Sequence, residues 1–302
     1  MKKPRSLVCK VLFFTLIVLQ YRTVLFGQNP LINPVEIRFS DNGNQLHGWF
    51  YKASGNGPFS TVILLHGSVG HDGDIFNLGE SLSKEGFNVM TYNYPGTWKS
   101  EGNKTDESSL NSVQSAINFA KSESSIQSFK SDTSEIILLG HSYGGGMALL
   151  GSVLDSTIKK VITIALGDLS LTADHLKENP DAKNYFQQTV DGILSNPSVA
   201  RGTTGKEYVE SLLINRDKYD LKKYSTELAK KDMLFLVGWF DNFKRIEDDV
   251  LPLYRELKSK GADNVKIEAF ETDHRFLNVQ TEFTENIIIW LKNGNNLLQQ
   301  KK

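Results

Sequence analysis

The chain has 302 residues, of which 39% are hydrophobic and 23% charged, and its 34 basic residues nearly balance 35 acidic ones. This composition is typical of a globular protein with one core, and it excludes a disordered or low-complexity chain. The charge balance gives no support to nucleic-acid binding, which favours a basic face. The single cysteine, Cys9, excludes a fold held together by disulfide bonds.

The first predicted element is an N-terminal export signal. Four basic residues precede an apolar run at positions 11–19, which is the order found in secretory signals. We expect residues 1–27 to be a signal peptide that is removed near Gly27, so that the protein is periplasmic or secreted. An uncleaved anchor is the alternative, and this segment would then be the only contact with a membrane. The apolar run is short for a bilayer-spanning helix.

The remaining residues, 28–302, are expected to form one domain in which strands and helices alternate. Strands near 35–39 and 46–51, separated by turn residues, predict an opening antiparallel hairpin. The alternation that follows predicts an α/β fold, with a mostly parallel sheet of eight strands flanked by helices. The expected elements are strands at 61–65, 87–92, 136–139, 161–165, 233–237 and 265–270, and helices at 76–84 and 107–121. The serine-rich stretch 122–134 is expected to be a solvated connection.

The pentapeptide Gly140-His141-Ser142-Tyr143-Gly144 lies between an apolar strand and a helical stretch. It predicts a nucleophile elbow, a sharp strand-to-helix turn that raises a serine above the sheet edge. The flanking glycines fit this turn, because a side chain there would collide with the neighbouring strand and helix. Ser142 is therefore the candidate nucleophile.

Two later strands end close to residues that could activate this serine. Asp241 follows the strand at 233–237, and His274 follows the strand at 265–270. Ligands bind at the carboxyl ends of the strands in open α/β sheets. A serine hydroxyl is a weak nucleophile, so we expect His274 to accept its proton while Asp241 orients the imidazole.

A glycine-rich turn, His66-Gly67-Ser68-Val69-Gly70, follows the strand at 61–65. Such a turn lets a backbone N–H approach the substrate closely, and Ser68 is the best candidate donor. The N–H of Tyr143, at the start of the helix after the elbow, is the second. Together these two groups predict an oxyanion hole.

These motifs resemble those of the α/β-hydrolase family over residues 35–292. The segment 92–102 and the tetrapeptide at 273–276 also resemble family motifs at their usual strand positions. Within the family, the resemblance is greatest to serine aminopeptidases, prolyl-oligopeptidase-type catalytic domains and esterases. It implies that Ser142 is the nucleophile, His274 the general base and acid, and Asp241 the orienting acid. It further implies that Ser68 and Tyr143 donate to the oxyanion, and it implies no cofactor.

Other carboxylates and histidines have alternative interpretations. Asp168 follows the strand at 161–165, a position from which some relatives supply the acid, and Asp248, Asp249 and Asp273 also lie near candidate loops. Asp273 adjoins His274 and is expected to order the loop. His66 is expected to hydrogen-bond within its loop and His141 to pack beside the nucleophile. His71, Asp72 and Asp74 favour a solvated loop and a helix cap over a metal site, so we assign no metal.

Residues 169–231 are inserted after the sixth strand and are expected to form a small helical cap. Helix-like composition occurs at 191–194, 207–215 and 221–230. Five aromatic residues of this region, which could line a pocket, are better explained as the core of the cap: Tyr185, Phe186, Tyr208, Tyr219 and Tyr224. Trp239 and Phe240 are the candidate walls of the substrate pocket, because a strand end holds them beside Asp241.

The combined reading is a serine hydrolase that cleaves a carboxylic ester through an acyl-enzyme on Ser142. Its partner is then a small ester, and neither a nucleic acid nor a metal is required. One alternative is a hydrolase of short peptides or amides, in which His274 protonates a poorer leaving group. The other alternative is a binding protein that uses a hydrolase fold without catalysis.

Overall fold

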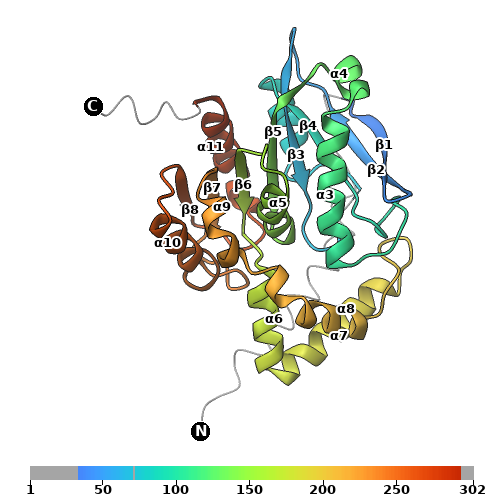
Figure 1. The fold of residues 1–302 in the computed structure, drawn as a ribbon, viewed down its shortest axis with the longest axis vertical. Helices are drawn as coiled ribbons and strands as arrows, with labels where there is room; N and C mark the ends of the chain where they lie inside the picture. The colour runs from blue at the N-terminus through green and yellow to red at the C-terminus, as the bar shows by residue number, and fades with distance from the viewer. Residues whose placement is uncertain (1–32, 71, 294–302) are drawn as a thin grey trace. The chain divides into compact units, whose positions relative to one another are not determined.

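A computed structural model describes residues 33–70 and 72–293, so the expected signal peptide at 1–27 lies outside the described residues. Eight strands form one sheet in the order β1-β2-β4-β3-β5-β6-β7-β8 (Figure 1). The strands are β1 (Val35–Asp41), β2 (Asn44–Tyr51), β3 (Phe59–Leu65), β4 (Asn88–Tyr92), β5 (Ser131–His141), β6 (Lys160–Ile164), β7 (Asp232–Gly238) and β8 (Val265–Phe270). Pairing is antiparallel in β1–β2 and β2–β4 and parallel from β4 to β8. The predicted fold class and the opening hairpin are confirmed.

Alternating side chains on the central strands bury both faces of the sheet. In β3, Ile63 and Leu65 belong to one buried cluster, whereas Val62 and Leu64 belong to a second cluster. Successive side chains of a strand point to opposite faces, so these two clusters lie on the two sides of the sheet. This explains why residues 62–65 of the strand are a continuous run of aliphatic residues with no polar alternation.

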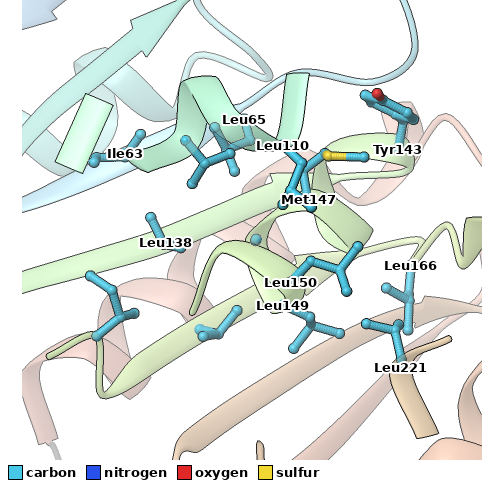
Figure 2. Packing of buried hydrophobic residues seen from close by; sticks show 14 of the residues in the cluster. Ile63, Leu65, Leu110, Leu138, Tyr143, Met147, Leu149, Leu150, Leu166 and Leu221 are labelled. Atoms are coloured by element: carbon cyan, nitrogen blue, oxygen red, sulfur yellow. The ribbon is translucent and has the colours of Figure 1, made fainter. Parts of the chain in front are cut away.

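Helices cover both faces of the sheet. The first cluster contains side chains of α3 (Asp106–Ala120), α5 (Tyr143–Leu154) and α10 (Leu251–Ser259), and the second contains those of α2 (Leu78–Lys84) and α11 (Gln280–Asn293). Figure 2 shows part of the first cluster, where Leu138 of β5, Met147 of α5 and Tyr143 at the start of α5 are labelled. The helix after the elbow is therefore seated on the buried core, which fixes the position of its first residue.

The stretch 122–134 differs from its prediction, because most of it is helix and strand. Helix α4 (Glu123–Phe129) begins after Ser122, whose hydroxyl accepts a hydrogen bond from the N–H of Ser125. Phe129 at its end stacks on Phe50 with ring centroids 3.7 Å apart. Serine is a weak helix former in a helix interior but a strong N-cap. The cap at Ser122 and the buried ring of Phe129 therefore stabilise a helix in a segment whose polar composition predicted a loop.

The insertion between β6 and β7 is helical, as predicted, but its helices begin at Leu169, well before the first predicted helical stretch at 191–194. They are α6 (Leu169–Glu178), α7 (Pro180–Leu194), α8 (Gly205–Ile214), the 3-10 turns η1 (Arg216–Lys218) and η2 (Leu221–Tyr224), and α9 (Ser225–Leu228). Helices α6, α7 and α8 lie together at one end of the sheet in Figure 1. No side chain of α7 is fully buried, and only the last residues of this helix were predicted.

Candidate active site

Ser142 occupies a strained turn between β5 and α5. Its backbone has φ 54° and ψ −117°, a conformation that costs a non-glycine residue about 1–3 kcal/mol. Neighbouring backbone holds it there: the N–H of Ser142 donates to the carbonyl of Ile164 at 2.8 Å, and its own carbonyl accepts from Gly145 and Gly167 at 2.9 Å each. This is the elbow geometry that the sequence predicted.

The glycines of the elbow are explained by close backbone approach. A Cβ on Gly140 would lie 2.0 Å from the carbonyl oxygen of Gly144, and a Cβ on Gly144 would lie 2.2 Å from that of Leu65. These obstructing atoms belong to the backbone and cannot rotate away. Helix α5 can therefore start directly above the carboxyl ends of β3 and β5 only if both positions lack a side chain.

The structure brings Ser142, His274 and Asp241 into one hydrogen-bonded chain. His274 Nδ1 lies 2.8 Å from Asp241 Oδ2, and His274 Nε2 lies 3.0 Å from Ser142 Oγ. When Nδ1 carries the proton, it donates to Asp241, and Nε2 is free to accept the hydroxyl proton of Ser142. The three residues are thus arranged for proton transfer from the serine to the imidazole.

The Asp241 carboxylate is buried and fully used by hydrogen bonds. Its second oxygen, Oδ1, accepts from the N–H groups of Phe243 and Lys244 at 2.8 Å each. Burial alone would raise the pKa of Asp241, but the hydrogen bond to His274, its charge and the two N–H donors together lower it. The carboxylate is therefore ionised at neutral pH and can stabilise a positive imidazolium.

Of the two predicted oxyanion donors, Tyr143 directly follows Ser142, and Ser68 lies in the loop after β3. Tyr143 is the first residue of α5, so its N–H has no acceptor within the helix. Ser68 is exposed in the loop after β3, and the adjoining Gly67 lies beside the elbow, since a Cβ built on it would be 3.8 Å from Ser142 Cβ. Their role as donors remains a prediction.

The aromatic residues near the triad differ in part from those expected. Phe243, whose side chain is 41% exposed, has its ring centroid 5.3 Å from that of His274. Phe243 was not among the residues expected at the site. It lies two positions after Asp241, and its N–H donates to the Asp241 carboxylate. Phe240 is 60% exposed on the same loop. Trp239 lines a hollow of about 540 Å³ beside α10 and β8, with Ile246, Leu251 and Tyr254 among its neighbours.

The remaining candidate acids have other partners. Asp168 caps α6, because its Oδ1 accepts from the N–H and the hydroxyl of Ser170. Asp273 orders its loop, as predicted, by accepting from the N–H and the guanidinium of Arg275. Asp249 lies 3.4 Å from the ammonium of Lys244. Asp241 is the carboxylate that meets His274.

His66, which was expected to hydrogen-bond within its loop, contacts Thr91 of the neighbouring strand β4, whereas His141 packs beside the triad as expected. His66 Nε2 lies 2.7 Å from the hydroxyl of Thr91. The ring of His141 lies beside that of His274, with centroids 5.3 Å apart, and its Nε2 is 3.2 Å from the His274 carbonyl.

The acidic loop that precedes α2 also supplies a cap. Asp74 caps this helix through the N–H groups of Gly79 and Glu80. Asp72 is less solvated than expected, because it accepts from the indole of Trp49 and pairs with Lys99. His71 lies outside the described residues.

The described ranges contain neither a metal-binding cluster nor a membrane-spanning helix. Across 33–70 and 72–293, no cluster of three or more histidine, cysteine or acidic side chains is arranged to hold a metal ion. Within the same ranges, every helix is too short or too polar to cross a bilayer.

A protein-family model described as serine aminopeptidase, S33, matches residues 56–208. The chain is 30% identical to the uncharacterized protein YfhR of Escherichia coli O157:H7 over 178 residues, which are 54% of this chain and 60% of that protein. It is 26% identical to esterase EstD of Thermotoga maritima over 273 residues, 83% of this chain and 62% of EstD. The chain thus matches less than two thirds of either relative.

Solved structures show the same fold. The esterase Pf2001 of Pyrococcus furiosus superposes with a TM-score of 0.66 at 19% identity, covering 89% of this chain and 95% of that one. At this identity the likeness concerns the fold alone. The family match spans the glycine-rich turn after β3, the elbow and residues 169–208 of the cap, and we conclude that the chain belongs to the serine aminopeptidase S33 family of α/β-hydrolases.

Proposed function

We propose that this protein is a serine hydrolase that cleaves a carboxylic ester. The observation that carries the proposal is the continuous hydrogen-bonded chain from Asp241 through His274 to Ser142, with distances of 2.8 and 3.0 Å. A serine alone is inert toward esters at neutral pH, whereas a serine paired with an oriented imidazole is a nucleophile. The strained backbone of Ser142, held by its neighbours, supports the same conclusion.

The reaction divides into two halves. Ser142 Oγ forms a bond to the substrate carbonyl carbon while its proton passes to His274 Nε2, and the oxyanion that develops accepts from the N–H groups of Ser68 and Tyr143. The ester C–O bond then breaks, and the leaving alkoxide takes the proton from His274. Water attacks the acyl-enzyme with His274 again as base, which releases the acid and restores Ser142.

Two features favour an ester of a small molecule. Relatives in sequence and fold include proteins named esterases. The exposed ring of Phe243, which lies beside His274 on the loop that carries Asp241, offers an apolar surface close to the reacting atoms, which suits an acyl or aryl group.

Hydrolysis of a short peptide or amide is the second candidate, and the family match to a serine aminopeptidase model favours it. An amine leaves less readily than an alkoxide, so His274 would have to protonate it as the C–N bond breaks. Comparing p-nitrophenyl esters of short and long acyl chains with aminoacyl p-nitroanilides separates the two candidates. We expect faster turnover of an ester, and faster turnover of an anilide would reverse the assignment.

The nucleophile is tested with a fluorophosphonate probe, which forms a bond from Ser142 Oγ to phosphorus and releases fluoride. We expect the wild-type protein to be labelled and the Ser142→Ala variant to remain unlabelled. Labelling of both proteins would remove Ser142 from the mechanism. Labelling of neither would favour a binding protein that uses the fold without catalysis.

We also propose that residues 1–27 direct export of the protein. The basic start and the apolar run at 11–19 support this proposal. Intact-mass measurement on protein from its native cell envelope is expected to give a mature chain beginning near Gln28. A mass that includes residues 1–27 would favour the uncleaved anchor.

A further inference from the structure

A buried polar network lies behind Tyr143, the residue whose N–H is a proposed oxyanion donor. The ammonium of Lys104 donates to the Tyr143 hydroxyl at 3.0 Å and to Ser109 Oγ at 2.8 Å. The Tyr143 hydroxyl in turn donates to Asp106 Oδ1 at 2.9 Å. The phenol of Tyr143 therefore bridges a buried cation and a buried carboxylate.

This network is costly to bury. Lys104 is 4% exposed and Asp106 is 3% exposed, and removing two charges from water costs free energy that their attraction seldom repays in full. Burial lowers the pKa of Lys104 to about 8 and raises the pKa of Asp106. Apolar side chains of similar volume would fill the same space at less cost, so stability alone is a poor explanation for the network.

The second proposed donor, Ser68, is held from the same segment of chain. The indole N–H of Trp98 donates to the carbonyl of Val69 at 2.9 Å, and Val69 directly follows Ser68. Trp98 itself has φ 47°, a left-handed conformation that a tryptophan rarely adopts. The segment 96–106 thus contacts the loop of Ser68 through Trp98. It also contacts the side chain of Tyr143 through Lys104 and Asp106.

The cap is attached to this segment at both places. Near Trp98, cap residues 199–201 form backbone hydrogen bonds with the segment 96–106, at 2.9 to 3.0 Å. The N–H of Trp98 donates to the carbonyl of Val199, and the N–H of Arg201 donates to the carbonyl of Gly96. The N–H of Lys104 donates to the carbonyl of Arg201. The guanidinium of Arg201 also donates to the carbonyls of Trp98 and Ser100. Near Tyr143, the hydroxyl of Tyr208 on α8 donates to Asp106 Oδ1.

We propose that the segment 96–106 is a positioning element that sets the geometry of both oxyanion donors and that the cap holds it in place through Val199, Arg201 and Tyr208. This proposal rests on the proposed function, since it assumes an oxyanion hole at Ser68 and Tyr143. Trp98 and Tyr208 are then positioning residues, which act on the reaction without touching the substrate. The cap would contribute to catalytic rate as well as to substrate choice.

Two variants test this element, and each has a matched control. Trp98→Phe removes the indole N–H and keeps an aromatic ring, and Trp290→Phe makes the same change in a partly buried ring on α11. Tyr208→Phe removes one hydroxyl from the network, and Tyr224→Phe removes a cap hydroxyl that donates within the cap, to the carbonyl of Lys218. Activity toward a p-nitrophenyl ester, the rate of fluorophosphonate labelling and the thermal midpoint are measured for all four.

We expect Trp98→Phe and Tyr208→Phe to lower kcat and the labelling rate by about 10- to 100-fold with little change in KM, the scale on which misplaced catalytic groups act. The controls should stay within about twofold of the wild-type protein. Rates of Trp98→Phe and Tyr208→Phe equal to their controls would overturn the proposal, as would losses seen only in the thermal midpoint. Tyr208→Phe decides the outcome if Trp98→Phe does not fold.

Failure of the proposed function gives a different result. In that case the wild-type protein is not labelled, or Ser142→Ala is labelled equally, whatever the four variants do. A wild-type protein that reacts at Ser142 while Trp98→Phe and Tyr208→Phe match their controls would retain the hydrolase and reject the positioning element.

Discussion

Asp241 and Asp168 are both buried carboxylates that follow strands of the sheet, but their partners differ. Asp241 pairs with His274, whereas Asp168 accepts from backbone and hydroxyl groups at the start of α6. An aspartate therefore orients an imidazole at the end of β7, and another aspartate caps a helix at the end of the neighbouring strand β6. Both aspartates follow a strand of the parallel sheet, so only their hydrogen-bond partners distinguish the two roles.

We predict that Asp241→Asn lowers kcat by about 10³- to 10⁴-fold. The amide NH₂ of asparagine would donate to Nδ1 of His274, which places the imidazole proton on Nε2 and prevents it from accepting from Ser142. Asp168→Asn is the matched control, because its amide oxygen can still accept from Ser170. Steady-state kinetics on a p-nitrophenyl ester checks both variants, and a larger loss in Asp168→Asn would displace Asp241 as the acid.

Lys104 should give the stability of the protein a measurable pH dependence. Burial lowers its pKa from 10.5 in the unfolded chain to about 8 in the folded protein. Between these pH values the unfolded state binds more protons, so this group makes the free energy of unfolding rise with pH. In Lys104→Met this contribution is absent.

The measurement is urea unfolding of both proteins at several pH values across the interval from 8 to 10.5. The wild-type protein should gain stability relative to Lys104→Met as the pH rises through the interval. Parallel curves for the two proteins would show that Lys104 keeps an ordinary pKa in the folded state.

Among the structural elements, the strand-to-helix unit β5–α5 was the most predictable and the polar helices the least. The elbow is specified by consecutive residues, because each glycine meets backbone atoms that a side chain would displace. Helices α4 and α7 depend on a few distant contacts, such as the stacking of Phe129 on Phe50 and the tilted ring pair of Phe186 and Tyr208. Local composition does not reveal such contacts.

We expect Gly144→Ala to destabilise the protein by about 3 kcal/mol, because its methyl group would lie 2.2 Å from the Leu65 carbonyl oxygen and the backbone must move. Gly192→Ala on the exposed face of α7 is the contrasting change. No atom lies within 4 Å of its Cβ position, and alanine is the better helix former by about 1 kcal/mol. The urea midpoint should fall for Gly144→Ala and rise for Gly192→Ala. An unchanged midpoint for Gly144→Ala would contradict the packing argument.

At the scale of the whole molecule, the cap and the sheet share one core. Cap side chains Val209, Leu212 and Leu221 belong to the same buried cluster as Leu138 of β5 and Met147 of α5. Tyr208 and Tyr219, which were expected to form the cap's own core, are buried against the main domain: the Tyr208 hydroxyl bonds to Asp106 of α3, and Tyr219 belongs to the shared cluster. A cap that completes the main core is not an independent lid.

The shared core predicts that the cap and the sheet unfold together. All four tryptophans, Trp49, Trp98, Trp239 and Trp290, lie outside the cap, so their emission reports on the rest of the fold. Residues 28–302 contain no cysteine, so Ile214→Cys at an 81% exposed position of α8 accepts a single dye on the cap. Coincident urea transitions for the two probes are expected, and an earlier transition of the dye would mean a separable cap.

The sequence by itself determined the order of the strands, the elbow and the candidate nucleophile, because these features depend on neighbouring residues. Apolar runs define strands, and glycines mark the places where backbones touch. The tertiary structure alone decided which carboxylate meets His274, that the ring of Phe243 lies against it, and that Lys104 and Asp106 lie behind Tyr143. These contacts join segments far apart in the chain, and only the packing of both faces of the sheet brings them within hydrogen-bonding or van der Waals distance.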